Sequence, residues 1–201
     1  RSFPIKKSLA LVSDRVILLI ALFLFLQSGL EGLINNWTVV FLKEKIQVEN
    51  SSALYALSLY VTGMALMRLV MGLAWKNARG GQLLGLSFFL LFLGITLMKT
   101  GPYTGSAFGM VLIGAGSAAG FPLMFGFVGT RYAELSATAF SFVLSISLLG
   151  NMSVNIAMGR IAQRYGISHL SIFLYGLVAF MSVSAFLILR NINHSPSKSE
   201  Q

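Results

Sequence analysis

The stretch that decides the fold is Val16–Phe41, VILLIALFLFLQSGLEGLINNWTVVF, which holds a single charged residue, Glu31, in 26 positions. An α-helix rises about 1.5 Å per residue, so roughly 20 apolar residues cross the hydrocarbon core of a bilayer. Lipid offers no hydrogen-bond partner to the backbone, so a spanning segment of this kind satisfies its amides internally as a helix. The stretch therefore predicts a transmembrane helix.

Further apolar runs of similar length follow along the chain. They are Ala53–Trp75, Gln82–Met98, Gly105–Thr130, Ser136–Met158 and His169–Leu189. They lack the period-two alternation of a membrane barrel strand, and the segments between them are too short to hold a soluble domain. The sequence predicts an all-α polytopic membrane protein with six transmembrane helices.

Composition excludes several other classes of protein. Only 10% of the residues are charged, whereas soluble domains carry about 25%. The net charge of +9 would suit a nucleic-acid partner, but the basic residues stand at the ends of apolar runs and form no stripe. There is no cysteine, and His169 and His194 form no cluster. We therefore expect no nucleic-acid partner, no metal, no cofactor and no enzymatic activity.

The distribution of Lys and Arg predicts the orientation, because cytoplasmic ends are enriched in both. One side collects nine: Arg1, Lys6, Lys7, Arg15, Lys76, Arg79, Arg131, Arg190 and Lys198. The other side collects five: Lys43, Lys45, Lys99, Arg160 and Arg164. We expect both termini in the cytoplasm, in a plasma membrane or a bacterial inner membrane. A start at Arg1, without methionine, is expected of a segment of a longer chain.

An internal repeat relates the second and fifth runs. Leu57–Gly72 (LSLYVTGMALMRLVMG) aligns without a gap to Leu144–Gly159 (LSISLLGNMSVNIAMG) at an offset of 87, with five identities. If the second and fifth helices are equivalent, the six helices divide into two sets of three. Because three is an odd number, the second set enters the membrane from the opposite side, which predicts an inverted-topology repeat. The expected organisation is a linker (1–15), a first three-helix repeat (16–98), a second (99–189) and a cytoplasmic tail (190–201).

Several motifs resemble the major facilitator superfamily of transporters. Gly159–Gly166 (GRIAQRYG) is similar to its loop signature G-x-L-A-D-R-x-G, with Gln163 at the acidic position. Tyr60–Gly72 (YVTGMALMRLVMG) resembles the eighth helix of its sugar transporters. Gly29–Glu31 with Trp37 resembles the seventh helix, and Gly114–Pro122 and Glu134–Ser141 resemble the tenth and eleventh.

The resemblance is closest to fucose and glucose/galactose transporters, and it implies function. The chain would be the carboxy-terminal six-helix half, working with an N-terminal six-helix half. It would carry a small polar solute, a sugar, by alternating access coupled to a proton or sodium gradient. The same resemblance implies structural or gating roles for Gly159, Arg164 and Gly166.

The first run carries the main candidate site. Gln27, Glu31 and Asn35 are four residues apart and share one helical face, with Asn36 and Trp37 one step round. Amide and carboxylate groups beside an indole suit a sugar, and an acid within a membrane span is a candidate coupling-ion site. The alternative is that Glu31 pairs with a structural partner.

The fifth run carries a second polar row, Ser147, Asn151 and Asn155, again four apart. We expect Asn151 and Asn155 to line the solute cavity. Asparagine in a membrane helix can instead hold two helices together.

Three residues are candidates for gating or structure from their own properties. Arg68 lies inside the second run, close enough to its cytoplasmic end to snorkel. Gly120 and Pro122 lie in the glycine-rich fourth run, where proline removes a backbone donor and bends a helix. We expect close packing at the other glycines of this run and a hinge at these two.

Three other functions compete with solute uptake. The first is proton-driven efflux of drugs or metabolites, which Glu31 would serve equally. The second is an intramembrane hydrolase using Ser117 and His169, although His169 stands at a membrane edge. The third is a self-contained six-helix protein that dimerises.

Overall fold

The computed structural model describes residues 13–75 and 78–194, and within these ranges the chain is helical without strands. The elements are α2 (Arg15–Phe41), the π-helical turn η1 (Leu42–Ile46), α3 (Asn50–Leu73), α4 (Gly80–Thr100), α5 (Tyr103–Ser117), α6 (Gly120–Arg131), the 3₁₀ turn η2 (Ala133–Leu135), α7 (Ser136–Tyr165), the 3₁₀ turn η3 (Ile167–His169) and α8 (Leu170–His194). Six stretches of helix are long and apolar enough to cross a membrane. The all-helical fold class and the six candidate spans are thus as predicted.

Some helices extend beyond the predicted apolar runs. The loop predicted at residues 159–168 is mostly helix, because α7 continues to Tyr165 through residues that favour helix, and ends where Gly166 takes φ 86°. Residues 190–194, which belong to the segment predicted as a cytoplasmic tail, are helical and continue α8. Residues 1–12, 76–77 and 195–201, with Arg1, Lys6, Lys7, Lys76 and Lys198 of the orientation count, lie outside the described residues.

The fourth span is divided into two helices. α5 ends at Ser117 and α6 begins at Gly120, with Ala118 and Ala119 in a turn between them. Pro122 lies in the first turn of α6, where its missing N–H is tolerated, but it has no donor for the carbonyl of Ala118. The break therefore falls one turn before the proline, inside the segment where a bend is predicted.

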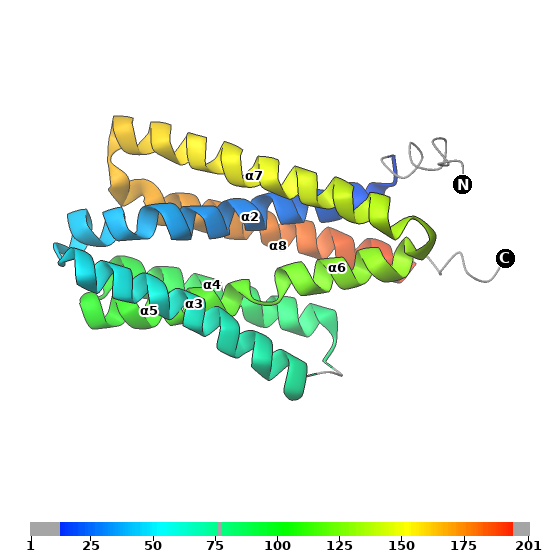
Figure 1. Ribbon diagram of the computed structural model, residues 1–201, viewed down its shortest axis with the longest axis horizontal. Helices are drawn as coiled ribbons and strands as arrows, with labels where there is room; N and C mark the ends of the chain where they lie inside the picture. Colours follow the sequence, from blue (N-terminus) through cyan, green and yellow to red (C-terminus); the bar gives the residue numbers. More distant parts are fainter. Residues whose placement is uncertain (1–12, 76–77, 195–201) are drawn as a thin grey trace.

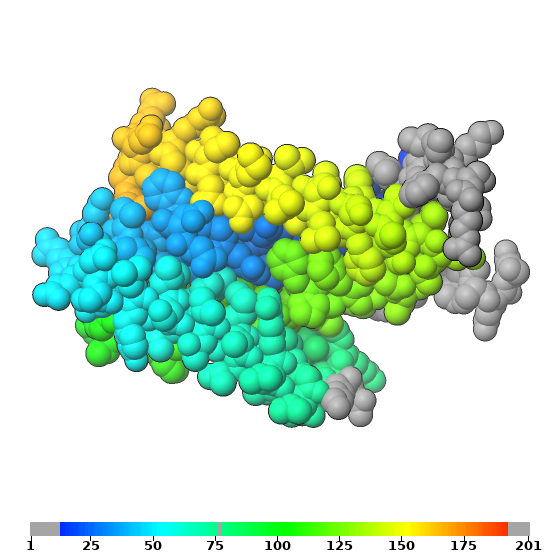
Figure 2. Space-filling model, viewed as in Figure 1, coloured from blue at the N-terminus to red at the C-terminus, as the bar shows by residue number. Residues whose placement is uncertain are grey.

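The first and fourth spans make most of the contacts between helices. α2 packs most extensively on α7, and α5 packs on α3 and α4, while α8 contacts α2 and α4. Figure 1 shows the first turn of α2 and the last turn of α8 at the same end of the bundle. In Figure 2 the face toward the reader is covered by α2, α3, α6 and α7, with α8 almost hidden behind them.

Glycine allows the closest helix crossings. A Cβ at Gly150 on α7 would collide with the carbonyl oxygen of Phe25 on α2, and one at Gly63 on α3 would collide with the carbonyl oxygen of Val111 on α5. Backbone oxygens cannot move aside as a flexible side chain can. Both crossings therefore require glycine, as small residues at membrane helix contacts generally allow.

Apolar side chains cover the outside of the bundle. Phe89 and Phe92 on α4, Leu148 and Met152 on α7, and Phe180 on α8 each leave more than half of their surface exposed. Such large exposed apolar areas are expected where lipid or another apolar partner surrounds the helices. Six apolar spans with apolar exteriors are compatible with a protein embedded in a membrane.

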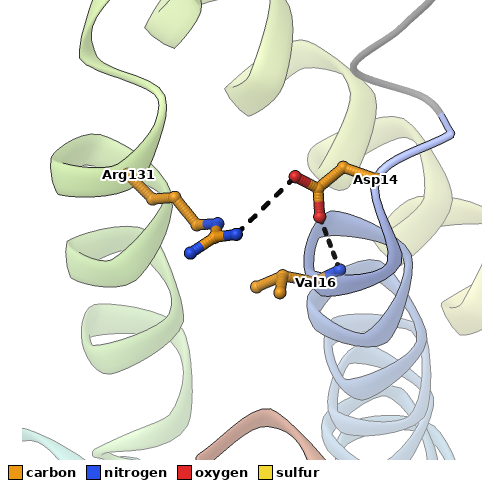
Figure 3. Close-up of polar contacts among 3 residues, drawn as sticks. All are labelled: Asp14, Val16 and Arg131. Atoms are coloured by element: carbon orange, nitrogen blue, oxygen red, sulfur yellow. Dashed lines mark hydrogen bonds and ion pairs between the residues drawn. The ribbon is translucent and has the colours of Figure 1, made fainter. Parts of the chain in front are cut away.

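A polar contact ties the start of α2 to the end of α6 (Figure 3). Asp14 accepts a hydrogen bond from the N–H of Val16 at 2.8 Å and so caps α2, and its other carboxylate oxygen lies 3.8 Å from the guanidinium of Arg131. Burial and the nearby charge of Asp14 raise the pKa of the neighbouring Tyr132 to about 12, so its phenol is neutral at physiological pH. This contact lies at the end of the bundle where α2 begins and α8 ends.

Candidate functional site

The polar residues of α2 and α7 meet in one hydrogen-bonded seam. The side-chain oxygen of Asn155 accepts from Asn36 Nδ2 and from Trp37 Nε1, both at 3.0 Å. Asn155 Nδ2 in turn donates to the backbone oxygen of Asn151 at 2.8 Å. Asn151 Nδ2 donates across the helix contact to the carbonyl of Ser28 at 3.1 Å. The α7 row therefore meets Asn36 and Trp37, one step round α2 from the predicted row of Gln27, Glu31 and Asn35.

Gln27 links Glu31 to the break in the fourth span. Its Nε2 donates to Glu31 Oε1 at 3.0 Å and to the carbonyl oxygen of Ser117 at 2.9 Å. Ser117 is the last residue of α5, where helix geometry leaves carbonyls without intrahelical donors. A side chain from α2 therefore supplies a donor that the interrupted helix lacks.

Two glycines make room for these polar groups. A Cβ at Gly120 would collide with Gln27 Oε1, so the amide fits only because α6 begins with glycine. A Cβ at Gly32 would stand 2.6 Å from Asn155 Nδ2 and 2.7 Å from Asn151 Nδ2. Glycine at both positions thus keeps open the space that the amide side chains occupy.

Helix α3 brings a phenol and a cation toward the same carboxylate. Tyr60 and Arg68 both lie within electrostatic range of Glu31. Tyr60 is 1% exposed and its hydroxyl has no hydrogen-bond partner among the described residues, whereas Arg68 is exposed. A carboxylate bonded to an amide, with a phenol and a guanidinium in electrostatic range, is placed to accept a hydrogen bond from a hydroxyl-bearing solute or, against the repulsion of the guanidinium, to bind a proton or a cation.

The predicted site residues divide by exposure. Gln27 is buried, Glu31, Trp37, Asn151 and Asn155 are partly exposed, and Asn35 and Asn36 are exposed. Asn35 Nδ2 donates to the backbone oxygen of Glu31 at 2.8 Å rather than to another helix. Ser147 also bonds within its own helix, to the carbonyl of Leu144 at 2.8 Å. Asn36, Trp37, Asn151 and Asn155 form one linked cluster, and Gln27 with Glu31 forms a second.

The predicted gating residues are spread over the structure. Gly166 ends α7 with a positive φ, which glycine adopts without strain. Gly159 lies within α7 and not in a loop, with the indole ring of Trp37 3.7 Å from where its Cβ would stand. The guanidinium of Arg164 lies 5.4 Å from the ring centre of Tyr165. Gly120 and Pro122 belong to the first turn of α6, beside Gln27.

Sequence reasoning missed Gly32, Tyr60 and Ser87. Ser87 on α4 is 3% exposed, and its hydroxyl has no partner among the described residues. Small or aromatic residues within apolar runs give no polar periodicity, so pattern alone does not distinguish them from packing residues. For Gly32 a signal was present: it stands between two site residues, on the helix predicted to carry the polar face.

Similarity to known proteins does not identify the chain. No protein-family model matches it, and no curated protein shows significant sequence similarity to it. The functional assignment therefore depends on the chemistry of the seam and on the motifs of the sequence.

Proposed function

We propose that this chain is half of a secondary transporter of the major facilitator type, which carries a small polar solute, a sugar, by alternating access. The observation that carries the proposal is the polar site built between α2, α7 and the α5–α6 break. Gln27 joins Glu31 to the carbonyl at the break at 3.0 and 2.9 Å. Interrupted helices and buried polar groups near mid-membrane are the usual elements of transporter sites.

The packing order supports an inverted repeat in this proposal. In such a repeat α2 corresponds to α5, α3 to α7, and α4 to α8. The contact between α2 and α7 then corresponds to the contact between α5 and α3, and the contact between α2 and α8 to that between α5 and α4. Gly63 and Gly150, aligned by the 87-residue offset, each admit a backbone carbonyl from the first span of the other set. A repeat whose copies interlock would produce these paired contacts.

The chemistry of the site supports a solute with several hydroxyl groups. The amides of Asn35, Asn36 and Asn155 can donate and accept, and the indole of Trp37 offers an apolar ring face. Glu31 is the carboxylate within the first apolar run, and burying a charge at mid-membrane costs at least about 2.5 kcal/mol, which favours a functional role. In the proposal Glu31 binds the coupling ion, a proton or sodium, and the exposed face of α2, α3, α6 and α7 meets an N-terminal six-helix half.

The test is gradient-driven uptake by the intact protein in proteoliposomes. The probes are radiolabelled D-glucose, D-galactose and L-fucose, with an imposed pH or sodium gradient. We expect accumulation of at least one sugar, and its loss in the Glu31→Gln variant with insertion unchanged. Asn191→Ala is the matched control, because among the described residues Asn191 bonds only the carbonyl of Leu187 on its own helix, at 2.7 Å.

The result also separates the competing functions. Full gradient-driven accumulation by Glu31→Gln would remove Glu31 from the mechanism. Export of apolar dyes, without accumulation of any of the three sugars, would replace sugar uptake by efflux.

A further inference from the structure

A small cavity lies behind the candidate site, between α2, α4, α8 and the α5–α6 break. Its volume is about 10 Å³, which is the space that one water molecule needs. Its wall includes Gln27, Ser87, Ser117, Gly120 and Met181. Most of the remaining wall is apolar, so the polar groups within it decide what it can hold.

Two unpartnered side chains converge on this cavity. Gln27 is 1% exposed, and its Oε1 has no hydrogen-bond partner among the described residues. Ser87 is 3% exposed, and its hydroxyl is likewise unpartnered there. Leaving a buried polar atom without a partner is unfavourable, and native structures rarely do so without water.

The donors around the cavity are already engaged, apart from one. Both protons of Gln27 Nε2 are directed at Glu31 Oε1 and at the Ser117 carbonyl, and the Ser117 hydroxyl donates to the carbonyl of Ile113 at 2.9 Å. Gln27 Oε1 can only accept. The Ser87 hydroxyl can rotate either to donate or to accept. A small molecule that donates a hydrogen bond to Gln27 Oε1 and forms another with the Ser87 hydroxyl would give both atoms a partner.

We infer that a single buried water joins Ser87 to Gln27, and that Ser87 is thereby a positioning residue for Glu31. The water accounts for both unpartnered atoms at once. It also fixes which way the Gln27 amide faces: turned over, the amide would present its oxygen to the carboxylate and to the Ser117 carbonyl. Ser87 thus acts on Glu31 through the water and Gln27, without touching it. The positioning role rests on the proposed function, whereas the water site does not.

Met181 provides a direct reporter of the water. X-ray radiolysis of bound water yields hydroxyl radicals at the water's own position, and methionine sulfur is readily oxidised to the sulfoxide. Met181 is 2% exposed and lines the cavity, whereas Met110 and Met158 are fully buried and do not line it. In the intact protein in lipid nanodiscs, we expect Met181 to be oxidised several-fold faster than both controls.

Variants and ion replacement complete the labelling test. Ser87→Val removes the hydroxyl and fills the space, so it should lower Met181 oxidation to the level of the controls. Equal, low oxidation of the three methionines in the unmodified protein would overturn the water site. Protection of Met181 by sodium chloride but not by choline chloride would also overturn it, since a sodium ion would then be the occupant.

The positioning role is tested separately by sugar uptake. Ser87→Ala should lower uptake by about five-fold, the equivalent of one hydrogen bond of about 1 kcal/mol. Ser87→Thr, which keeps the hydroxyl, should restore it. Ser171→Ala is the control, because Ser171 is also buried and unpartnered among the described residues but does not line the cavity. Unchanged uptake in Ser87→Ala, with Met181 still labelled in the unmodified protein, would overturn the positioning role alone.

Discussion

The α2–α7 and α3–α5 crossings are alike in their backbones and different in their side chains. At each, a glycine admits a carbonyl oxygen of the opposite helix: Gly150 meets Phe25, and Gly63 meets Val111. Around Gly150 stand Asn151 and Asn155, hydrogen bonded across the contact. Around Gly63 the packing is through Tyr60 and Met64. The same close approach is therefore accompanied by amide hydrogen bonds across the contact at Gly150, and by the packing of Met64 beside the buried phenol of Tyr60 at Gly63.

The largest expected effect tests the shared part of this comparison. Gly63→Ala and Gly150→Ala should each destabilise the protein by about 3 kcal/mol, because the added methyl group meets a backbone oxygen and overpacking at rigid contacts costs this much. The measurement is the unfolding temperature and the yield of monodisperse protein in detergent.

Gly72→Ala and Gly85→Ala are the controls for that experiment, since no atom of the described residues lies within 4 Å of a Cβ at either position. They should leave the unfolding temperature close to that of the unmodified protein. If one crossing tolerated alanine and the other did not, the two crossings would not be equivalent.

The next effect tests the part that differs. Asn151 and Met64 are related by the 87-residue offset. Asn151→Leu should cost about 0.6–1.7 kcal/mol, the range for polar contacts between membrane helices, and should abolish uptake. Met64→Leu conserves volume, so it should cost less than about 1.5 kcal/mol and leave uptake intact. Equal uptake by the two folded variants would place the chemistry elsewhere.

The polar half of the comparison was only partly visible in the sequence. Spacing by four predicted that Gln27, Glu31 and Asn35 share a face, and hydrophobic length predicted the spans, because both follow from helix geometry and bilayer thickness. The donor that Gln27 gives to Ser117, 90 residues away, depends on how helices pack. The length of α7 was underestimated, because Arg160 and Arg164 lower hydropathy without ending a helix.

A third contact joins α2 to the fourth span through a side chain instead of a backbone carbonyl. Gly120→Ala would place a methyl group on Gln27 Oε1, while Gln27→Ala would remove the amide and its bonds. Combined, the two changes should cost about 1 kcal/mol less than their sum, as residues in direct contact commonly do. The measurement is a double-mutant cycle on the free energy of unfolding.

Gly126→Ala supplies the control for this cycle, because a Cβ there has no neighbour within 4 Å in the described part of the chain. Its effect and that of Gln27→Ala should simply add. Additivity in the Gly120 cycle as well would mean that the side chain of Gln27 moves away from α6 without cost, unlike the carbonyls at the two glycine crossings.

The smallest effect is expected where α2 meets α6 at the end of the bundle, at Asp14. Its carboxylate both caps α2 and faces Arg131 at 3.8 Å, with side chains 29–31% exposed. Asp14→Ala removes both interactions and should cost about 1 kcal/mol, nearly all from the cap. Asp14→Asn keeps a good cap and loses only a solvent-screened ion pair, so it should cost less than about 0.5 kcal/mol. Measuring the free energy of unfolding in low and high salt separates the contribution of the ion pair from that of the cap, since salt weakens the ion pair and leaves the cap unchanged. A larger loss in Asp14→Asn, disappearing at high salt, would show that charge holds α6 to α2 here, in contrast to the amide and carbonyl contacts that hold the interior.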